Sequence, residues 1–238
     1  MITVYDISET THPETIARGA SPFVRTITFV LRYKKLEYEI IPVGFTNIER
    51  VARELGASPT ITEPKPKYTV PFIKDSTTGK VISDSVAIAQ YLDTTYPDTS
   101  LVVPPGSEYL QRLFRDQILN LTSDVFKVWL RPKLIKYFSK EIQEMIPTSD
   151  PTPEELSEAL KKGKEDFEKL SQSLNGGAPF RSFIMGGDKP TFGDLHMVAF
   201  LHFLLFIEGD ESAEWKEIRS WANGWLGWEV DQILKLVL

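Results

Sequence analysis

A proline lies inside a stretch that otherwise has the composition of a buried β-strand, Tyr68-Thr69-Val70-Pro71-Phe72. Because proline donates no ladder hydrogen bond, it is excluded from the interior of a central strand. A cis peptide bond costs little relative to trans only before proline, and it would place Pro71 at the start of the strand. We therefore predict a cis Val70–Pro71 bond that turns the backbone N–H and C=O of Val70 outward, where an extended peptide can pair with them.

A second polar feature follows about one strand later, where Ser83-Asp84-Ser85 opens the helical run 86–92. The unpaired N–H groups of a helix start bind anions. Serine is also a common N-cap, so the simplest interpretation is that Ser83 or Ser85 only caps this helix. Taken together with the Val70 backbone, the alternative is a pocket for a small, extended peptide that carries a carboxylate.

The first hundred residues alternate between strand and helix patterns, and residues 57–67 form a loop rich in proline. Period-two and continuous apolar runs predict strands over 2–7, 37–43, 68–74 and 80–82. Apolar residues at helical spacing predict helices over 21–35, 47–55 and 84–96. The order β-α-β-α-β-β-α indicates a mixed sheet covered by helices, which is an α/β domain.

The strand signal disappears beyond the proline-rich segment 97–106, which is the predicted linker. We expect one domain over residues 1–97 and an all-α domain over residues 107–238. Helical patterns cover 108–138 with a break at Pro132, then 153–174 and the nearly all-apolar run 195–207. The sequence Thr191-Phe192-Gly193-Asp194 fits a capping box at the start of that last run.

Composition excludes several classes of function. A net charge of −6 disfavours a nucleic-acid surface, although Arg131, Lys133 and Lys136 form a local basic cluster. The absence of cysteine excludes disulfides, thiolate zinc sites and a cysteine nucleophile. His196 and His202 lie six residues apart, which does not match a metal-binding pair on one helix face, so no metal is expected. Without a signal peptide or an apolar run of membrane-spanning length, a cytoplasmic protein is expected.

Ser21 stands at the predicted start of the first helix, in Arg18-Gly19-Ala20-Ser21-Pro22-Phe23. Proline favours the first helical position, which makes Ser21 the N-cap. It can serve as a cap and nothing more. Alternatively, its hydroxyl and the free N–H groups at the positive helix end stabilise an anion, including a thiolate.

With these features in view, the chain resembles the glutathione transferases, and more closely the fungal class related to bacterial β-aryl etherases. The resemblance spans the whole chain and implies a thioredoxin-like N-terminal domain followed by an all-α C-terminal domain. The matching motifs are Ser21-Pro22-Phe23-Val24-Arg25-Thr26, Ile41-Pro42-Val43-Gly44-Phe45-Thr46, Val70-Pro71, Asp84-Ser85-Val86-Ala87-Ile88 and Thr191 to Asp194.

The resemblance implies a role for each matching residue toward glutathione. Val70, before Pro71, would pair with the cysteinyl backbone, and Ser21 would donate a hydrogen bond to the sulfur. Asp84 would hold the γ-glutamyl amine and Ser85 its carboxylate, although many family members carry glutamate where Asp84 stands. The expected contacts of the glycyl end are Lys67 and Tyr68.

Some of these roles have rivals. Tyr5 lies in the first strand, where tyrosine-type transferases carry their sulfur-contacting residue, but the helix-start geometry favours Ser21. Arg25 either orients an anion or forms a salt bridge or solvated face. The walls of the electrophile pocket are predicted to be Phe23, Phe126 and Trp129, and the alternative is that Phe126 and Trp129 are core residues.

The resemblance implies an enzyme that conjugates glutathione to small hydrophobic or aromatic electrophiles. Cleavage of aryl ethers is a narrower version of the same chemistry. The alternative is a ligandin-like carrier of aromatic compounds with little turnover, which the four tryptophans between Trp215 and Trp228 would favour. A regulatory or scaffold module without chemistry is a third possibility. A homodimer is expected because dimers are common in the family.

Overall fold

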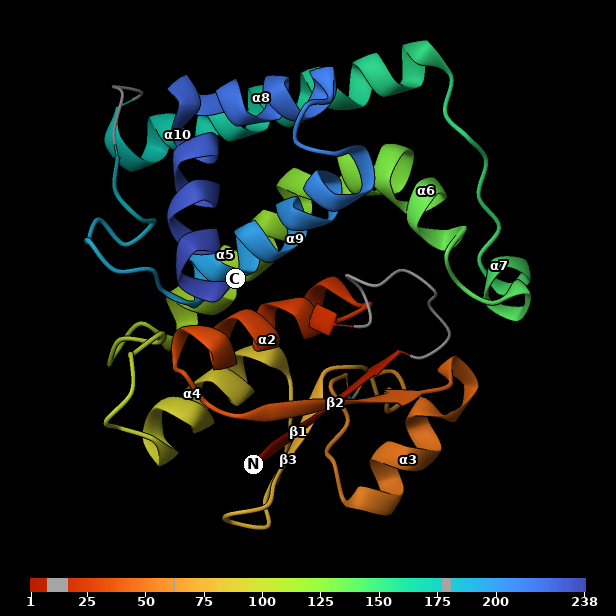
Figure 1. Cartoon of the computed structure of the whole chain (residues 1–238), viewed down its shortest axis with the longest axis vertical. Coiled ribbons are helices and arrows are strands. Elements are labelled where there is room, and N and C mark those ends of the chain that lie inside the picture. Colours follow the sequence, from red (N-terminus) through yellow and green to blue (C-terminus); the bar gives the residue numbers. More distant parts are fainter. Residues whose placement is uncertain (8–16, 62, 177–180) are drawn as a thin grey trace. The chain divides into compact units, whose positions relative to one another are not determined.

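The computed structural model describes residues 1–7, 17–61, 63–176 and 181–238 (Figure 1). These residues form two compact units. One comprises Met1–Gln111 with Val237, and the other comprises Arg112–Leu236 with Leu238. The first contains the sheet and the second is helical, which confirms the predicted fold class.

The first unit is built on a four-stranded mixed sheet with the order β2-β1-β3-β4. β1 pairs in parallel with β2 and antiparallel with β3, and β3 pairs antiparallel with β4. Figure 1 shows α2 and α4 on one side of the sheet and α3 on the other. The strands are β1 (Ile2–Ile7), β2 (Tyr38–Val43), β3 (Phe72–Asp75) and β4 (Val81–Ser83), and the helices are α2 (Pro22–Tyr33), η1 (Phe45–Asn47), α3 (Ile48–Leu55) and α4 (Ser85–Thr95).

The strand after Pro71 is shorter than predicted, because β3 begins only at Phe72 and not at residue 68. Pro71 has no N–H group to add to the ladder, so pairing starts after it. The Val70–Pro71 peptide bond is cis, as predicted, and a second cis bond precedes Pro64 in the loop.

Strand register gathers several chain segments at one end of the sheet. Tyr5, near the end of β1, pairs with Phe72 at the start of β3. Phe72 in turn pairs with Ser83 at the end of β4. Therefore the end of β1, the residues before β3 and the start of α4 meet at the same end of the sheet.

The second unit consists of helices. The long helix expected over 108–138 is divided, because α5 passes into a π-helical segment, η2, before α6 begins. The break thus precedes Pro132, which occupies the second position of α6. The elements are α5 (Glu108–Asp124), η2 (Val125–Leu130), α6 (Arg131–Ile135), α7 (Lys140–Met145), α8 (Pro153–Asn175), α9 (Phe192–Glu208) and α10 (Ala213–Val237).

The helix α9 is the buried core element that its composition predicted. Its start carries the expected capping box, in which Asp194 accepts hydrogen bonds from Thr191 N and Oγ1, both at 2.7 Å. The second carboxylate oxygen of Asp194 accepts from Ile184 N at 2.6 Å. His196 is completely buried, and burial lowers its pKa to about 3, so the ring is neutral, as expected of a core histidine.

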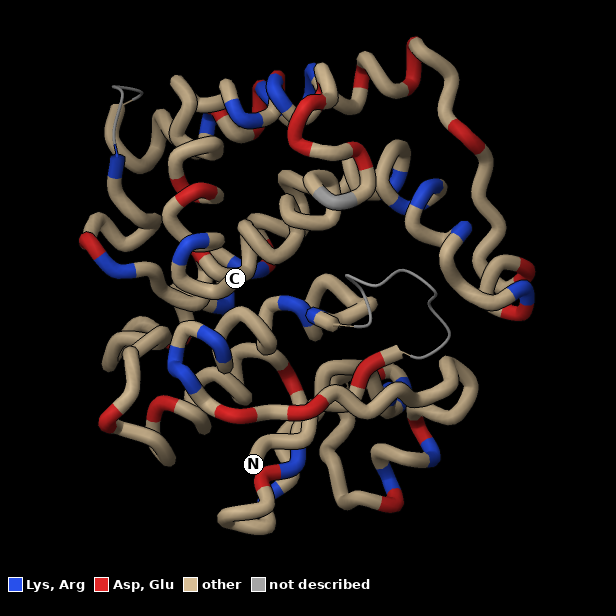
Figure 2. The backbone as a smooth tube through the Cα atoms, viewed as in Figure 1, with Lys and Arg blue, Asp and Glu red and all other residues tan. Residues whose placement is uncertain are grey.

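Basic residues form no continuous face in the part of the chain that the structure describes. Lys and Arg are interspersed with Asp and Glu along both units (Figure 2). Within the basic cluster of the second unit, Lys133 pairs with Glu208, and Lys136 pairs with Asp150 at 2.7 Å. The cluster therefore consists largely of ion-paired helix residues.

A buried carboxyl group on α10 makes stability depend on pH. Glu229 is fully buried, and burial together with Asp194 raises its pKa well above the ordinary value. The stabilisation from keeping Glu229 protonated is complete below the pKa that Glu229 has in the unfolded chain. It is lost as the pH rises toward the higher pKa of Glu229 in the folded protein.

We expect Glu229→Gln, which keeps the shape and removes the ionisation, to be increasingly more stable than wild type above about pH 5. The gain should grow by at most about 1.4 kcal/mol per pH unit, measured by urea unfolding at several pH values. Glu217→Gln, at an exposed position of the same helix, is the control and should show no such trend. A Glu229→Gln difference that stays constant with pH would contradict the prediction.

Candidate functional site

The site lies at the sheet end where β1 finishes, β3 begins and α4 starts. Its polar groups come from Ser21 at the start of α2, from the Val70 backbone and from the segment Asp84-Ser85. These are the residues that the sequence placed in one pocket, and strand register brings the last two segments together.

Ser21 occupies the N-cap of α2, with Pro22 at the first helical position, as predicted. Its backbone is extended, with φ −89° and ψ 136°, but its hydroxyl does not cap the helix. Within the described residues the Ser21 hydroxyl has no hydrogen-bond partner, although the residue is only 7% exposed. Because it does not cap α2, this hydroxyl is placed to bind an incoming ligand.

The Asp6 carboxylate lies beneath the segment that leads into α2, a feature that the sequence reasoning missed. One oxygen accepts from Ala20 N at 2.5 Å, and the other accepts from Ser21 N at 3.2 Å and Ile7 N at 2.7 Å. Burial raises the pKa of Asp6 to about 7, against the opposing effects of these N–H donors and of Arg25. The available signal was a lone acidic residue within an apolar strand.

Arg25 lies one turn along α2 from Ser21 and is completely buried. The interpretation of Arg25 as part of a solvated face is therefore wrong. Its Nη2 donates to the Gly19 carbonyl at 3.0 Å, and its positive charge lowers the pKa of Asp6. Gly19 has φ +110°, and a side chain there would approach Arg25 N to 2.8 Å, so this segment requires glycine.

The Val70 backbone is the second element of the site. Val70 is 8% exposed and precedes the cis bond to Pro71. Neither its N–H nor its C=O makes a hydrogen bond with any other described residue. Buried backbone groups are nearly always paired. The N–H and C=O of Val70 are therefore suited to pair with the main chain of a ligand.

Asp84 caps α4, so the interpretation that Ser83 or Ser85 is the cap is wrong. The carboxylate of Asp84 accepts from Ala87 N at 3.0 Å. Asp84 has φ +73°, a conformation that costs energy for a residue other than glycine and concentrates at functional sites. Ser85 is the first residue of α4 and is 3% exposed, and its hydroxyl has no partner among the described residues.

Tyr5 is a poor rival to Ser21. Its ring stacks on Phe72 with centroids 4.7 Å apart, and burial and the charge of Glu39 raise the pKa of its hydroxyl. A raised pKa makes a phenol a weaker hydrogen-bond donor to an anion, which is opposite to what thiolate stabilisation requires.

The predicted glycyl contacts lie on the loop before β3. Lys67 is exposed and pairs with Ile61 in an isolated β-bridge. Tyr68 is half-buried, and the guanidinium of Arg53 on α3 lies 4.6 Å from its ring centroid. Arg53 is thus a cation beside Tyr68, in addition to Lys67. The sequence gave no signal of this contact, because Arg53 lies in an ordinary amphipathic helix.

Two family models cover most of the chain. The glutathione S-transferase N-terminal domain matches residues 20–95, and the glutathione S-transferase C-terminal domain matches residues 106–236. The chain belongs to the glutathione S-transferase family. It is a glutathione S-transferase with glutathione as its co-substrate.

Solved transferases share the whole fold. The glutathione S-transferase CsGST63524 of Ceriporiopsis subvermispora, in complex with glutathione, is 28% identical and has a TM-score of 0.84, covering 100% of this chain and 98% of its own. Glutathione transferase GSTFuA3 from Phanerochaete chrysosporium is 29% identical, with a TM-score of 0.74, covering 99% and 96%. The glutathione S-transferase-like protein ustS of Aspergillus flavus is 25% identical in an alignment 230 residues long that covers 87% of this chain and 81% of that protein.

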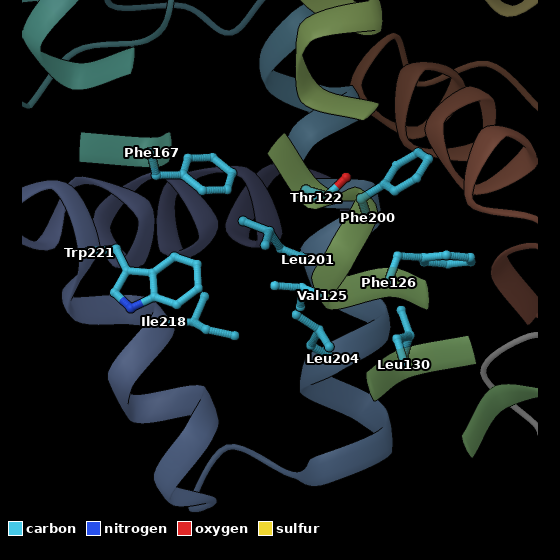
Figure 3. A pocket seen from close by; sticks show the side chains of 10 residues that line it. All are labelled: Thr122, Val125, Phe126, Leu130, Phe167, Phe200, Leu201, Leu204, Ile218 and Trp221. Carbon is cyan, nitrogen blue, oxygen red and sulfur yellow. The ribbon is translucent and has the colours of Figure 1, made fainter. Parts of the chain in front are cut away.

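The helical unit of this transferase encloses a small apolar cavity (Figure 3). Its volume is about 20 Å³, which is room for about one water molecule. Its polar lining includes the Thr122 hydroxyl, which donates to Ile118 O at 2.7 Å. The lining residues are Thr122, Val125, Phe126, Leu130, Phe167, Phe200, Leu201, Leu204, Ile218 and Trp221.

The three predicted wall residues of the electrophile pocket have different surroundings. Phe23 is half-buried at the second position of α2 in the first unit. Phe126 lines the cavity of the helical unit, with its ring 6.2 Å from that of Phe200. Trp129 is buried, and the Lys133 ammonium lies over its ring, 5.4 Å from the centroid.

The described residues contain no group of three or more histidine, cysteine, aspartate or glutamate side chains placed to hold a metal ion. The same part of the chain has no helix with both the length and the apolar character needed to cross a bilayer.

Proposed function

We propose that the Ser21 hydroxyl donates a hydrogen bond to the sulfur of bound glutathione and so favours the thiolate. The observation that carries this proposal is that the hydroxyl sits at the start of α2 without capping it and without a described partner. Ser21 is not a base, because its own proton is held too tightly. The thiolate then attacks an electrophilic carbon that the enzyme holds beside it.

The remaining site residues bind the tripeptide. The unpaired N–H and C=O of Val70 pair with the cysteinyl backbone, next to Pro71. Ser85 and the first N–H groups of α4 hold the γ-glutamyl carboxylate, since a helix start favours an anion. Asp84, whose Oδ1 caps α4, attracts the γ-glutamyl amine. The glycyl carboxylate lies near Lys67 and Tyr68.

The experiment that tests this function compares turnover of a model aryl halide between wild type and Ser21→Ala. Loss of turnover with glutathione affinity retained supports catalysis by Ser21, and equal rates remove that role. Ser212→Ala is the matched control, because Ser212 is also an N-cap and its hydroxyl accepts from Trp215 N at 3.2 Å in the helical unit.

Ser85→Ala should weaken glutathione binding by about ten-fold or more, because a hydrogen bond to a charged group contributes about 1.5–3 kcal/mol. Turnover at saturating glutathione should stay within about two-fold, since the γ-glutamyl end does not react. Calorimetric titration measures the affinity. The matched control is Ser83→Ala, two residues earlier at the end of β4. Equal affinities of Ser85→Ala and wild type would contradict the assignment.

We extend the proposal to small hydrophobic or aromatic electrophiles, for which Phe23, Phe126 and Trp129 stay the predicted wall residues. The proposed class is the serine type related to the etherases, and its support is the Ser21 hydroxyl at the start of α2. In the etherase version the thiolate forms a C–S bond while the C–O bond breaks, and a phenolate leaves. An aryl ether with a fluorescent phenol tests it, because release of the phenol must require glutathione. The homodimer and the cytoplasmic location stay predictions.

A carrier of aromatic compounds is the second candidate function, but the apolar cavity beside Trp221, at about 20 Å³, is too small to hold an aromatic ring and does not favour it (Figure 3). The other tryptophans of α10 argue for packing, since Trp215 and Trp225 are buried and Trp225 donates to Ser182 O at 3.0 Å. Quenching of tryptophan fluorescence by aromatic ligands, unchanged by glutathione and by Ser21→Ala, would support a carrier.

A further inference from the structure

Asp6 is a buried titratable group beside Ser21 that the proposed chemistry leaves without a role. It is 2% exposed near the end of β1, and it accepts hydrogen bonds from the segment just before α2. Its partners are the backbone N–H groups of Ala20 and Ser21, the two residues that immediately precede the helix.

We propose that Asp6 is a positioning residue for Ser21. By holding the N–H groups of Ala20 and Ser21, its carboxylate fixes the serine hydroxyl where it meets the sulfur of glutathione. This inference rests on the proposed function of Ser21. Asp6 touches neither glutathione nor the reacting atoms in this scheme, so its effect passes entirely through Ser21.

The geometry explains why the Ser21 hydroxyl is available. A serine at an N-cap usually turns its oxygen back to the first turn of its helix. Here a buried carboxylate already stabilises the positive end of α2, so electrostatics no longer require the serine oxygen there. The second anchor is Arg25, which donates to the Gly19 carbonyl at 3.0 Å, so the segment entering α2 is held by a carboxylate and a guanidinium.

Two effects of the Asp6 charge oppose each other. As a nearby negative charge, it disfavours a thiolate, whereas by placing the Ser21 hydroxyl it favours one. Arg25 on α2 offsets the direct charge effect, and the register partner of Asp6 on β2 is Pro42, which does not titrate. We therefore expect the positioning effect to be the larger of the two. The two effects predict opposite signs for the change in the thiol pKa of glutathione when Asp6 is neutralised.

The experiment uses wild type, Asp6→Asn, Ser21→Ala and the double variant Asp6→Asn/Ser21→Ala. For each we measure the thiol pKa of bound glutathione by thiolate absorbance, and kcat and KM with an aryl halide. Asp98→Asn, at an exposed position of the same unit, is the control for the loss of one carboxylate. Thermal midpoints establish that each variant is folded.

We expect Asp6→Asn to raise the thiol pKa and to lower kcat by about ten-fold to a hundred-fold, the effect of misplacing a group by about 1 Å, with KM for glutathione within two-fold. In the Ser21→Ala background the same change should have less than about a two-fold effect, because residues acting through one another are not additive. A lowered thiol pKa, or an equal loss of kcat in both backgrounds, overturns the proposal. If Ser21→Ala alone has no effect, the function proposed for Ser21 fails instead.

The wild type provides a second measurement should Asp6→Asn not fold. With S-methylglutathione bound, hydrogen exchange of the Ala20 and Ser21 amide protons reports whether the Asp6 carboxylate holds them. We expect both amide protons to exchange much more slowly than those of an open chain. Exchange of either amide proton at the rate of an open chain overturns the proposal, because the segment that enters α2 is then not held.

Discussion

Replacing Ser21 by alanine is expected to lower turnover of an aryl halide by about fifty-fold at about pH 6.5 and to leave it nearly unchanged at about pH 9.5. This prediction assumes that Ser21 lowers the thiol pKa of glutathione by about two units from a reference of about 8.5. At the lower pH about half of the thiol is then ionised in wild type and about one hundredth in the variant. At the higher pH both proteins hold almost all of it as thiolate.

The assumed shift agrees with what one hydrogen bond can supply. Two pKa units correspond to about 2.7 kcal/mol, and a hydrogen bond to a charged acceptor contributes about 1.5–3 kcal/mol. The free N–H groups at the start of α2 add to the same field, and the variant retains them. Ser21→Ala should therefore keep some thiolate stabilisation, which makes fifty-fold an upper bound.

A pH–rate profile of kcat/KM for the aryl halide at saturating glutathione, for both proteins and with Ser212→Ala as the control, makes this measurement. The diagnostic result is a shift of the acidic limb of the profile by about two pH units with an unchanged plateau. A lowered plateau with an unshifted limb would contradict thiolate stabilisation and would indicate a loss of structure. The Ser21→Thr variant, which keeps a hydroxyl, should lie nearer wild type than Ser21→Ala.

The sequence was informative where one or two adjacent residues determine the backbone. Pro71 could be placed at the start of a strand because proline lacks an N–H group, and the structure has the predicted cis bond. Ser21 was identified as an N-cap because Pro22 follows it. The capping box of α9 was evident because its two residues are three positions apart.

The sequence was uninformative where a contact joins distant segments. Asp6 and Ser21 lie 15 residues apart in the sequence, and nothing near Asp6 in the sequence signals its partners. The cap of α4 was misassigned because Asp84 has a positive φ, which is uncommon for a residue other than glycine and has no local sequence signal here. The π-helical turn before Pro132 likewise reflects packing within the helical unit more than local propensity.

Asp194→Ala should destabilise the protein by about 3–5 kcal/mol, which is the largest stability effect that we expect from one substitution. The carboxylate is fully buried and accepts from Ile184 N, Thr191 N and Thr191 Oγ1. Its removal leaves those donors unsatisfied in the core, at about 1–3 kcal/mol for each buried donor. Asp194→Asn, which retains one carbonyl acceptor, should lie between wild type and alanine.

The same chain provides a matched exposed capping box. At the start of α8, Thr152 N donates to Glu155 at 2.8 Å, and Glu155 N donates to Thr152 Oγ1 at 3.2 Å. Because water can replace the lost carboxylate there, Glu155→Ala should cost no more than about 1 kcal/mol. Urea unfolding of both variants measures the difference. Similar losses at the two sites would show that the cap geometry, and not burial, sets the stability of α9.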